Sequence, residues 1–512
     1  MLRRILVAAL LAACGAAHAA LPEPVARLLQ AANIPEEAMG AVVMRGDAVL
    51  LSHNAELPMQ PASTMKLVTT MVGLDQLGPV FKGRTELRAT GDVVNGALQG
   101  DLYLRGGADP DFDEDALVHM LEKLRTQGIR KITGDLVLDR QLFQPARTDV
   151  GAPPFDESPE SYYNVIPDAL LLNMNMLRVD ISSTATQVKL DMLPVLERVT
   201  VASDMQLVDG DCAKWEGGWK LPTYERRGAR ITVTLHGTFP RNCAKTTAVN
   251  VLDRNDYAEG LFRSSWARLG GTFTGKAREA LPGGATPATS RLLSEHVSRP
   301  LMDVLRDINK PSDNGLARTL FLSLGSLEAD AVLGSRPLAP IYTAPPQGAA
   351  GPGVGDPQAG ALAAATVLPT AIRAEQVIRA WMQRQGIDDN GLVLENGSGL
   401  SRLERVKPAQ MAGLLRAAQK SLWMPEFLTS LPIAAVDGTM RRRLKDSAAA
   451  ARARVKTGAL RNVVSIAGYV PDANGDLCIV VAMVNHELVG NGNGRKAVDA
   501  LIDWVAQARR LQ

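Results

Sequence analysis

Between about Lys82 and Pro282 the sequence differs in pattern from the segments on either side of it. Short apolar runs separated by glycine and asparagine turns predict a β-rich region there, with isolated helices. The flanking segments have amphipathic patterns typical of helices, and the last third also has apolar runs typical of strands. The two end segments share one hydrophobic pattern, and the middle has another. This arrangement predicts a single α/β (α+β) domain that is interrupted by a β-rich insertion. The insertion forms one domain or two lobes.

The individual elements follow from hydrophobic periodicity and turn residues. Strands are expected at Gly40–Met44, Ala48–Ser52, Arg84–Ala89, Leu98–Leu104, Lys131–Leu138, Leu177–Ile181, Val188–Met192, Glu197–Ala202, Ile231–His236, Arg454–Thr457, Val463–Val470 and Leu477–Val484. Helices are expected at Pro22–Ala32, from Ser63 to about Leu77, and at Asp113–Arg125, Leu301–Ile308, Asp313–Leu324, Ala371–Gln385, Pro408–Ala418 and Ala497–Gln507.

A chain of 512 residues is long enough for two or three domains. We expect the interrupted domain to consist of residues 20–82 and 286–512, with residues 83–285 as the insertion. Residues 337–365 are rich in proline, glycine and alanine and have almost no charge. This composition predicts a flexible loop within the second part.

Residues 1–19 have the pattern of a secretory signal peptide. Two arginines precede the apolar run Ile5–Ala13, and Ala17-His18-Ala19 is a small-residue cleavage site. A competing interpretation is lipoprotein processing at Cys14, which would leave a lipid anchor. We expect a periplasmic protein, with lipid anchoring at Cys14 as the alternative. Outside this leader no apolar run reaches the ~18–20 residues of a membrane span.

The net charge and the cysteine content limit the possible partners and cellular compartment of the protein. The formal net charge of +2 falls to about zero once the two leader arginines are lost, and the basic residues are spread, so no nucleic-acid partner is expected. Cys212 and Cys243 lie in a loop-rich region and could pair in an oxidising compartment. Cys478 lies in an apolar run and is expected to be a buried thiol.

Ser63 precedes Lys66 by three residues at the start of a predicted helix. Positions i and i+3 share a helix face, so the hydroxyl and the amine can meet. A serine becomes a nucleophile when a base takes its proton, and a partly buried lysine can lose its charge and act as that base. Taken alone, the pair is a weak signal, because a helix cap beside a solvated lysine explains it better.

Two further motifs favour the chemical interpretation. Ser312-Asp313-Asn314 stands where a loop enters a helix, and Lys456-Thr457-Gly458 stands at the end of a predicted strand. A helix cap and a strand-ending turn would explain each of them separately, and a second S-x-N at Ser52–Asn54 is interpreted as structural. The three motifs together, in this order, are those of penicillin-binding proteins and β-lactamases.

On these motifs the chain resembles the penicillin-binding serine D-alanyl-D-alanine carboxypeptidases/endopeptidases of the penicillin-binding protein 4 type (peptidase family S13). The resemblance covers almost the whole mature chain and extends to Leu104–Gly107, Asn396–Arg402 and Val436–Arg441. Only residues 337–365 are longer than expected. It implies a penicillin-binding protein/β-lactamase-like transpeptidase domain, an antiparallel sheet flanked by helices, split by a two-lobed insertion.

The resemblance also implies a role for each motif residue. Ser63 would attack the carbonyl of the penultimate D-alanine and form an acyl-enzyme. Lys66 would accept the proton of Ser63, and the positive charge of Lys456 would help to lower the pKa of Lys66. Ser312, held by Asn314, would relay the proton towards the leaving amine, with Lys456 assisting. Which lysine acts as the base at each step stays open.

Substrate-binding positions follow by the same resemblance. Thr457 would bind the terminal carboxylate of the substrate, with Gly458 and Ala459 beside it on the same strand. The backbone N–H groups of Ser63 and Ala459 would form the oxyanion hole. No cofactor and no metal are implied.

Asp156 and Arg402 match positions that in the family help to bind the amine or carboxylate of the diaminopimelate side chain. A loop cap and a structural ion pair are the alternative interpretations of these two residues. The implied partners are peptidoglycan stem peptides ending in D-Ala-D-Ala, D-Ala-diaminopimelate crosslinks, and β-lactams as covalent inhibitors. The implied role is cell-wall remodelling, and the balance between carboxypeptidase and endopeptidase action stays open, as does the oligomeric state.

Other classes of enzyme fit less well. A Ser-His-Asp hydrolase would need a G-x-S-x-G motif, and Ser398 lacks its first glycine. The six histidines lack the spacing of a zinc peptidase. A β-lactamase would share all three motifs, but the large insertion and the S-D-N motif without tyrosine favour the peptidase. An inactive peptidoglycan-binding scaffold would not need the intact motif residues.

Overall fold

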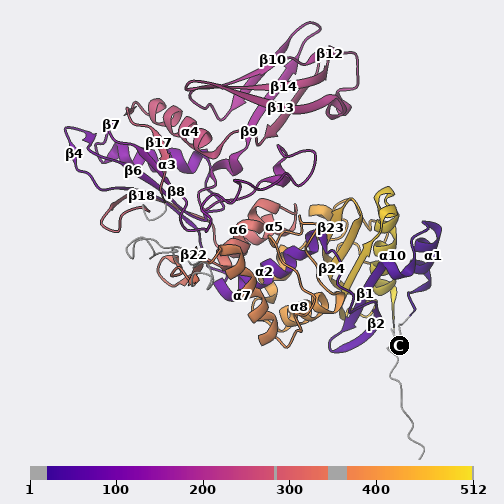
Figure 1. The fold of residues 1–512 in the computed structure, drawn as a ribbon. Coiled ribbons are helices and arrows are strands. Elements are labelled where there is room, and N and C mark those ends of the chain that lie inside the picture. The colour runs from indigo at the N-terminus through magenta and orange to yellow at the C-terminus, as the bar shows by residue number, and fades with distance from the viewer. Residues whose placement is uncertain (1–19, 282–284, 344–365, 510–512) are drawn as a thin grey trace, which may run out of the picture.

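The computed structural model describes residues 20–281, 285–343 and 366–509. The predicted leader, with Cys14, and residues 344–365 of the predicted loop lie outside the described residues. The remaining chain forms a helical and sheet-containing part built from both ends of the sequence, and a second part built from its middle (Figure 1). Within the described ranges, no helix is both long and apolar enough to cross a membrane.

A five-stranded antiparallel sheet organises the first part, with the strand order β2-β1-β25-β24-β23. Its strands are β1 (Met39–Arg45), β2 (Ala48–His53), β23 (Arg454–Leu460), β24 (Val463–Pro471) and β25 (Leu477–Asn485). Alternate residues of a strand point to opposite faces, and β25 accordingly divides its side chains between two cores. The sheet is therefore buried on both faces, which explains its nearly continuous apolar strands.

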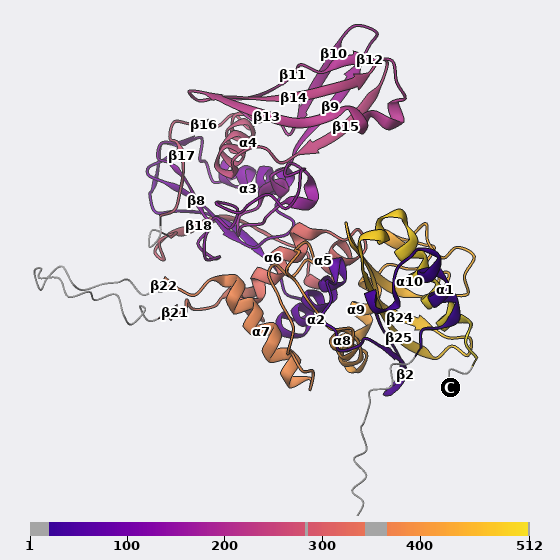
Figure 2. The same cartoon turned by 45° about the vertical axis from the view of Figure 1, so that its right-hand side comes forward.

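Helices cover both faces of this sheet (Figures 1 and 2). One face packs against α1 (Glu23–Ala31) and α10 (Asn493–Gln507). The other face packs against a helical layer made of α2 (Lys66–Leu77), α5 (Leu301–Asn309), α6 (Asn314–Leu324), α7 (Thr370–Arg384), α8 (Pro408–Lys420) and α9 (Met424–Ser430). Within this layer α2 is almost entirely buried. Because α2 is packed on nearly all sides, the residues at its N-terminus are held in a fixed direction.

One lobe of the insertion contains a five-stranded sheet, β17-β8-β6-β3-β18, a smaller sheet, β16-β7-β5-β4, and two helices. The elements are β3 (Arg84–Ala89), β4 (Val93–Val94), β5 (Ala97–Leu98), β6 (Leu102–Gly107), α3 (Glu114–Thr126), β7 (Lys131–Ile132), β8 (Leu136–Asp139), α4 (Arg254–Arg268), β16 (Thr272–Phe273), β17 (Ala277–Glu279) and β18 (Arg291–Val297).

Two single strands predicted in this lobe, Leu98–Leu104 and Lys131–Leu138, are each broken into two. Gly100 has a φ of 111°, and a Cβ on Gly134 would lie 2.2 Å from the backbone of Gly100. The two breaks thus touch each other, and only glycine fits there. Helix α4 was not predicted, because Arg254, Arg263 and Ser265 are buried among its apolar residues and interrupt the hydrophobic periodicity.

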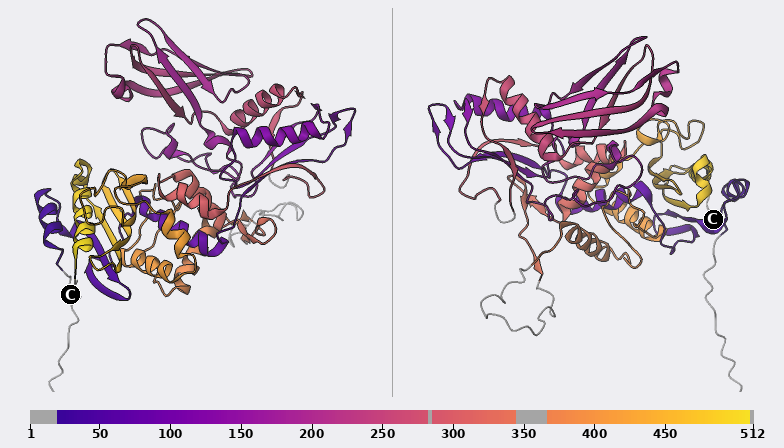
Figure 3. Two further views of the ribbon diagram at one scale, coloured as in Figure 1. Left: turned by 180° about the vertical axis from the view of Figure 1, so that it is seen from behind. Right: turned by 45° about the horizontal axis from the view of Figure 1, so that its top comes forward.

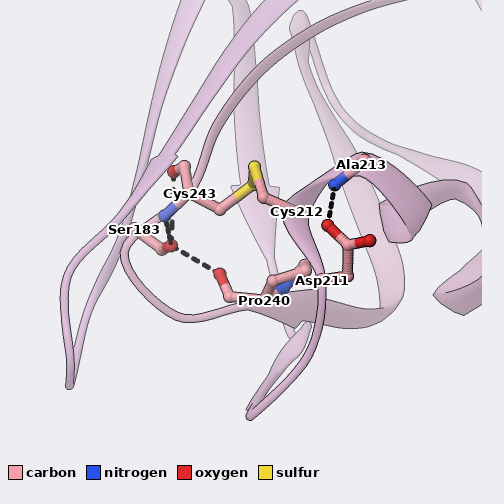
Figure 4. The surroundings of a disulfide bond; sticks show 6 residues. All are labelled: Ser183, Asp211, Cys212, Ala213, Pro240 and Cys243. Atoms are coloured by element: carbon pink, nitrogen blue, oxygen red, sulfur yellow. Dashed lines mark hydrogen bonds between the residues drawn. A yellow bond between two sulfur atoms is a disulfide. The ribbon is translucent and has the colours of Figure 1, made fainter.

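The second lobe consists of β-strands (Figure 2), and its buried apolar residues form one continuous core with those of the other lobe. Its strands are β9 (Leu177–Ser183), β10 (Val188–Leu193), β11 (Val199–Ser203), β12 (Gln206–Val208), β13 (Trp219–Arg227), β14 (Arg230–Pro240) and β15 (Ala244–Val249). Cys212 and Cys243 form a disulfide (Figure 4), as the sequence allowed. Cys478 is a buried free thiol, as predicted.

The chain leaves and re-enters the first part at one place. The backbone N–H of Ser298 donates to the Gly83 carbonyl at 3.0 Å, and that of Gly83 donates to Ser298 Oγ at 3.0 Å. Both lobes therefore lie on one side of the helical layer, as the two views of Figure 3 show. Because β18 pairs with β3, we propose that the insertion extends beyond Val297, past the boundary predicted at residue 285.

Candidate active site

The three sequence motifs meet at the junction of α2, α6 and the edge strand β23. Ser63 lies in a short 3-10 helix, Ala62–Met65, that leads into α2. Ser312 and Asn314 lie at the start of α6, and Lys456 lies on β23. The structure thus brings together all five residues predicted to be catalytic.

Lys66 is fully buried and has three oxygen atoms around its amine. The Nζ atom lies 3.1 Å from Ser63 Oγ, 2.6 Å from Asn314 Oδ1 and 2.6 Å from the Ser398 carbonyl oxygen. The last two oxygens can only accept hydrogen bonds. A neutral amine that donates to both therefore turns its lone pair towards the Ser63 hydroxyl, which is the arrangement of a general base.

Burial lowers the pKa of Lys66 to about 7. The carboxylates of Asp313 and Glu404 act in the opposite direction, and the guanidinium of Arg318 adds to the lowering. A substantial fraction of the amine is thus neutral near neutral pH. Arg318 is thus a cation that assists burial, and the predicted effect of Lys456 on the pKa of Lys66 stays a prediction.

Lys456 is also fully buried, and its Nζ atom donates to Ser312 Oγ at 2.8 Å and to the Thr457 carbonyl at 2.8 Å. Burial, followed by the charge of Lys66, lowers the pKa of Lys456 well below its usual value. The two serines of the motifs are therefore each paired with a buried lysine.

Ser312 has a φ of +72° and Ala62, next to Ser63, has a φ of +45°. Non-glycine residues in this left-handed region are uncommon and cluster at functional sites. The segment after Ser312 is held in place, because Asp313 caps α6 by accepting the Leu316 N–H at 2.8 Å.

The insertion contacts the S-D-N motif directly. The Tyr162 hydroxyl donates to the Asp313 carboxylate, and Asn314 Nδ2 donates to the Tyr163 carbonyl at 2.9 Å. Tyr162 and Tyr163 begin a short 3-10 helix, Tyr162–Asn164. No pattern in the sequence pointed to these two contacts.

Thr457 is half exposed on β23, and its Oγ1 atom lies 2.8 Å from the Thr439 Oγ1 atom, with Thr457 donating. In this arrangement the exposed Thr439 hydroxyl keeps its O–H as a donor, beside Lys456 and Ser312. The arrangement can accept a carboxylate, as the resemblance implied for Thr457.

Arg402 lies against Phe155, the residue before Asp156, with 5.3 Å between its guanidinium carbon and the ring centroid. The Asp156 carboxylate accepts hydrogen bonds from Tyr163 Oη at 2.7 Å, Asn164 Nδ2 at 2.8 Å and the Ser158 N–H at 3.0 Å. These bonds outweigh burial, which acts in the opposite direction, and lower the pKa of Asp156. Asp156 is therefore a loop cap, and its predicted role in substrate binding stays a prediction.

In the described ranges no three histidine, cysteine, aspartate or glutamate side chains come together to hold an ion. The pair of serines and the pair of lysines are groups for nucleophilic attack and proton transfer. This set of groups indicates acyl transfer through a serine.

The model of the D-Ala-D-Ala carboxypeptidase 3 (S13) family matches residues 21–333 and 361–508. The chain belongs to this family. The predicted class, a serine D-Ala-D-Ala carboxypeptidase, is thereby confirmed. Residues 334–360, which the match leaves out, fall largely within the segment that the sequence marked as longer than expected.

Relatives and solved structures agree with this assignment. The D-alanyl-D-alanine carboxypeptidase DacB of Haemophilus influenzae is 28% identical over 86% of this chain and 84% of its own length. The D-alanyl-D-alanine carboxypeptidase of Actinomadura sp. (strain R39) is 28% identical over 97% of this chain and 86% of its own length. The crystal structure of penicillin-binding protein 4 (dacB) from Haemophilus influenzae has a TM-score of 0.72 at 23% identity, covering 94% of this chain and 99% of that one. The predicted fold class is thus confirmed.

The S13 site depends on one close backbone approach. A Cβ atom on Gly458 would lie 2.8 Å from Ser63 N, 2.8 Å from the Pro61 carbonyl oxygen and 2.3 Å from Ser465 Oγ. The last residue of the K-T-G motif must therefore be glycine for β23 to lie against the nucleophile.

We expect Gly458→Ala to lower the rate of covalent modification of Ser63 by a β-lactam at least tenfold, because the added methyl group pushes β23 away from Ser63. Overpacking of this kind costs about 1–3 kcal/mol of stability. Stopped-flow labelling at saturating and subsaturating β-lactam would measure the rate. Gly217→Ala, where the backbone is outside the left-handed region and nothing lies within 4 Å of the Cβ position, is the control for glycine replacement. A wild-type rate in Gly458→Ala would contradict the close approach.

Proposed function

We propose that this S13 enzyme cleaves the bond after the penultimate D-alanine of peptidoglycan stem peptides, through an acyl-enzyme on Ser63. The observation that carries the proposal is the amine of Lys66, buried, 3.1 Å from Ser63 Oγ and held by two oxygens that can only accept. That geometry supports proton transfer from Ser63 to Lys66 as the hydroxyl attacks.

The remaining steps use the neighbouring groups. Attack of Ser63 Oγ on the carbonyl carbon forms a tetrahedral oxyanion, which the N–H groups of Ser63 and Ala459 would stabilise. The C–N bond then breaks, and the proton that Lys66 took from Ser63 passes to the leaving amine through Ser312, which receives a hydrogen bond from Lys456. Water hydrolyses the resulting ester, releases the shortened peptide and restores the Ser63 hydroxyl.

Binding of the terminal carboxylate is proposed at Thr457 and Lys456. A carboxylate beside these residues would favour the charged form of Lys456, in opposition to burial. β-Lactams carry a carboxylate and an acylating carbonyl at similar positions, so we propose that they acylate Ser63 as well. The complex of Haemophilus influenzae penicillin-binding protein 4 with a β-lactam supports this.

The periplasm is the proposed location. The predicted leader over residues 1–19 supports secretion, and the Cys212–Cys243 disulfide supports an oxidising compartment. Cleavage after Ala19 and lipid anchoring at Cys14 remain the two proposed forms of the mature N-terminus, which mass spectrometry of the exported protein would distinguish.

We expect the enzyme to release D-alanine from a stem pentapeptide, and digestion of purified muropeptides followed by mass spectrometry tests this. Loss of the mass of one alanine indicates carboxypeptidase action, and conversion of crosslinked dimers to monomers indicates endopeptidase action. Turnover of β-lactams with no change in any muropeptide would favour a β-lactamase. No reaction with either substrate would favour an inactive peptidoglycan-binding scaffold and would contradict the proposal.

A further inference from the structure

Glu404 is a fully buried carboxylate outside the three motifs. Its Oε1 atom accepts the backbone N–H groups of Glu395 at 3.2 Å, Asn396 at 3.0 Å and Gly397 at 2.8 Å. Its Oε2 atom accepts the N–H of Gly399 at 2.9 Å. One side chain thus fixes the backbone of the segment 395–399 at four points.

This segment is folded tightly around Ser398. Gly397 and Gly399, on either side of it, have φ values of 68° and 80°. A Cβ atom on Gly399 would lie 1.8 Å from the Ala62 carbonyl oxygen, and Thr69 of α2 donates to the Gly397 carbonyl at 2.6 Å. The segment therefore packs directly against the start of the helix that carries Ser63.

Segment 395–399 places one hydrogen-bond acceptor next to Lys66, the proposed general base. The Ser398 carbonyl oxygen lies 2.6 Å from Lys66 Nζ and takes one of the two N–H groups of the neutral amine. If this carbonyl moved away, the amine could rotate, and its lone pair would lose its fixed direction towards Ser63. Orientation of a reacting group is worth several powers of ten in rate when it is complete.

The charge of Glu404 also reaches Lys66. The other charged groups that face Lys66 are Asp313, at the start of α6, Arg318, one turn later, and Lys456 on β23. Asp313 and Glu404 raise the pKa of Lys66, and Arg318 lowers it. Burial raises the pKa of Glu404, while its four N–H bonds act in the opposite direction and favour the ionised form.

We propose that Glu404 is a positioning residue for Lys66: its carboxylate holds segment 395–399 so that the Ser398 carbonyl aims the lone pair of Lys66 at Ser63. This inference rests on the proposed function, because it gives Lys66 the role of general base. Glu404 itself does not touch the reacting atoms.

The test is the pH dependence of acylation by a fluorescent penicillin in Glu404→Gln. The glutamine oxygen can replace Oε1, but its NH₂ group would face the Gly399 N–H, donor against donor. We expect the acylation rate to fall at least tenfold. Because a negative charge is removed, we also expect the acid limb of the rate profile to move to lower pH. A role limited to stability would leave this limb in place.

Glu122→Gln is the control, since it neutralises an exposed carboxylate on α3, outside segment 395–399 and its contacts. Its rate and acid limb should stay within twofold and within a few tenths of a pH unit of the wild type. Glu404→Asp retains the charge but shortens the side chain, so its rate should fall while its limb stays in place.

Rates are divided by the concentration of sites that label to completion, so that unfolded protein does not count. A wild-type rate per site together with a wild-type limb in Glu404→Gln would overturn the inference. If Glu404→Gln does not fold, a wild-type rate per site in Glu404→Asp would overturn it instead. Absence of labelling in the wild type itself would reject the proposed function, which separates the two failures.

Discussion

Replacing Ser63 by alanine is expected to abolish covalent labelling by fluorescent penicillin and to lower D-alanine release at least ~10⁴-fold. The proposed reaction passes through an ester on Ser63 Oγ, and alanine has no atom that can form it. The Lys66 amine would then face a methyl group in place of the hydroxyl at 3.1 Å. Gel fluorescence and the intact mass of the protein after incubation with penicillin would measure the adduct.

Ser312→Ala is the control for this experiment. Ser312 is likewise bonded to a buried lysine, but it is proposed to relay a proton and not to carry the acyl group. Labelling should therefore persist in Ser312→Ala, at a lower rate. A penicillin adduct of full stoichiometry in Ser63→Ala would place the nucleophile elsewhere and reject the mechanism.

The sequence predicted those parts of the fold that have a regular hydrophobic pattern. The hairpin of β1 and β2 and the helices α2, α8 and α10 lie within a few residues of their predicted bounds, because their apolar residues repeat with the period of the element. Prediction failed where tertiary contacts override the pattern. Helix α4 buries arginine side chains through ion pairs and carbonyl contacts, and the Gly100–Gly134 contact interrupts two strands.

The site was predictable to the extent that side chains do its chemistry. Ser63, Lys66, Ser312, Asn314 and Lys456 meet as the motifs implied. Segment 395–404 acts differently, because Ser398 contributes a carbonyl oxygen that every residue type has, and Glu404 acts through backbone N–H groups. Neither contact can be recognised from the amino-acid types in the sequence. Each joins positions whose proximity depends on the whole fold. The resemblance covered Asn396–Arg402 but gave a role there only to Arg402.

The acylation rate is expected to rise with pH through about 7, the pKa of Lys66. Only the neutral amine can take the proton of Ser63, and burial makes that form available. Below the pKa each pH unit removes about nine tenths of the remaining neutral amine, so the rate at pH 5 should be about one hundredth of its plateau. The measurement is the second-order rate of penicillin labelling between pH 5 and pH 9.

Lys66→Ala and Lys456→Ala assign this limb to one of the two lysines. Loss of a positioned general base lowers a rate by about 10²–10⁴-fold, so Lys66→Ala should label that much more slowly and show no limb near pH 7. Lys456→Ala should also label more slowly, because its hydrogen bond to Ser312 and its proposed contact with the carboxylate are lost. It should nevertheless retain the limb, since burial of Lys66, and not Lys456, is the main cause of the lowered pKa. A limb that persists in Lys66→Ala and disappears in Lys456→Ala would make Lys456 the base for attack, with Lys66 left to hold Asn314.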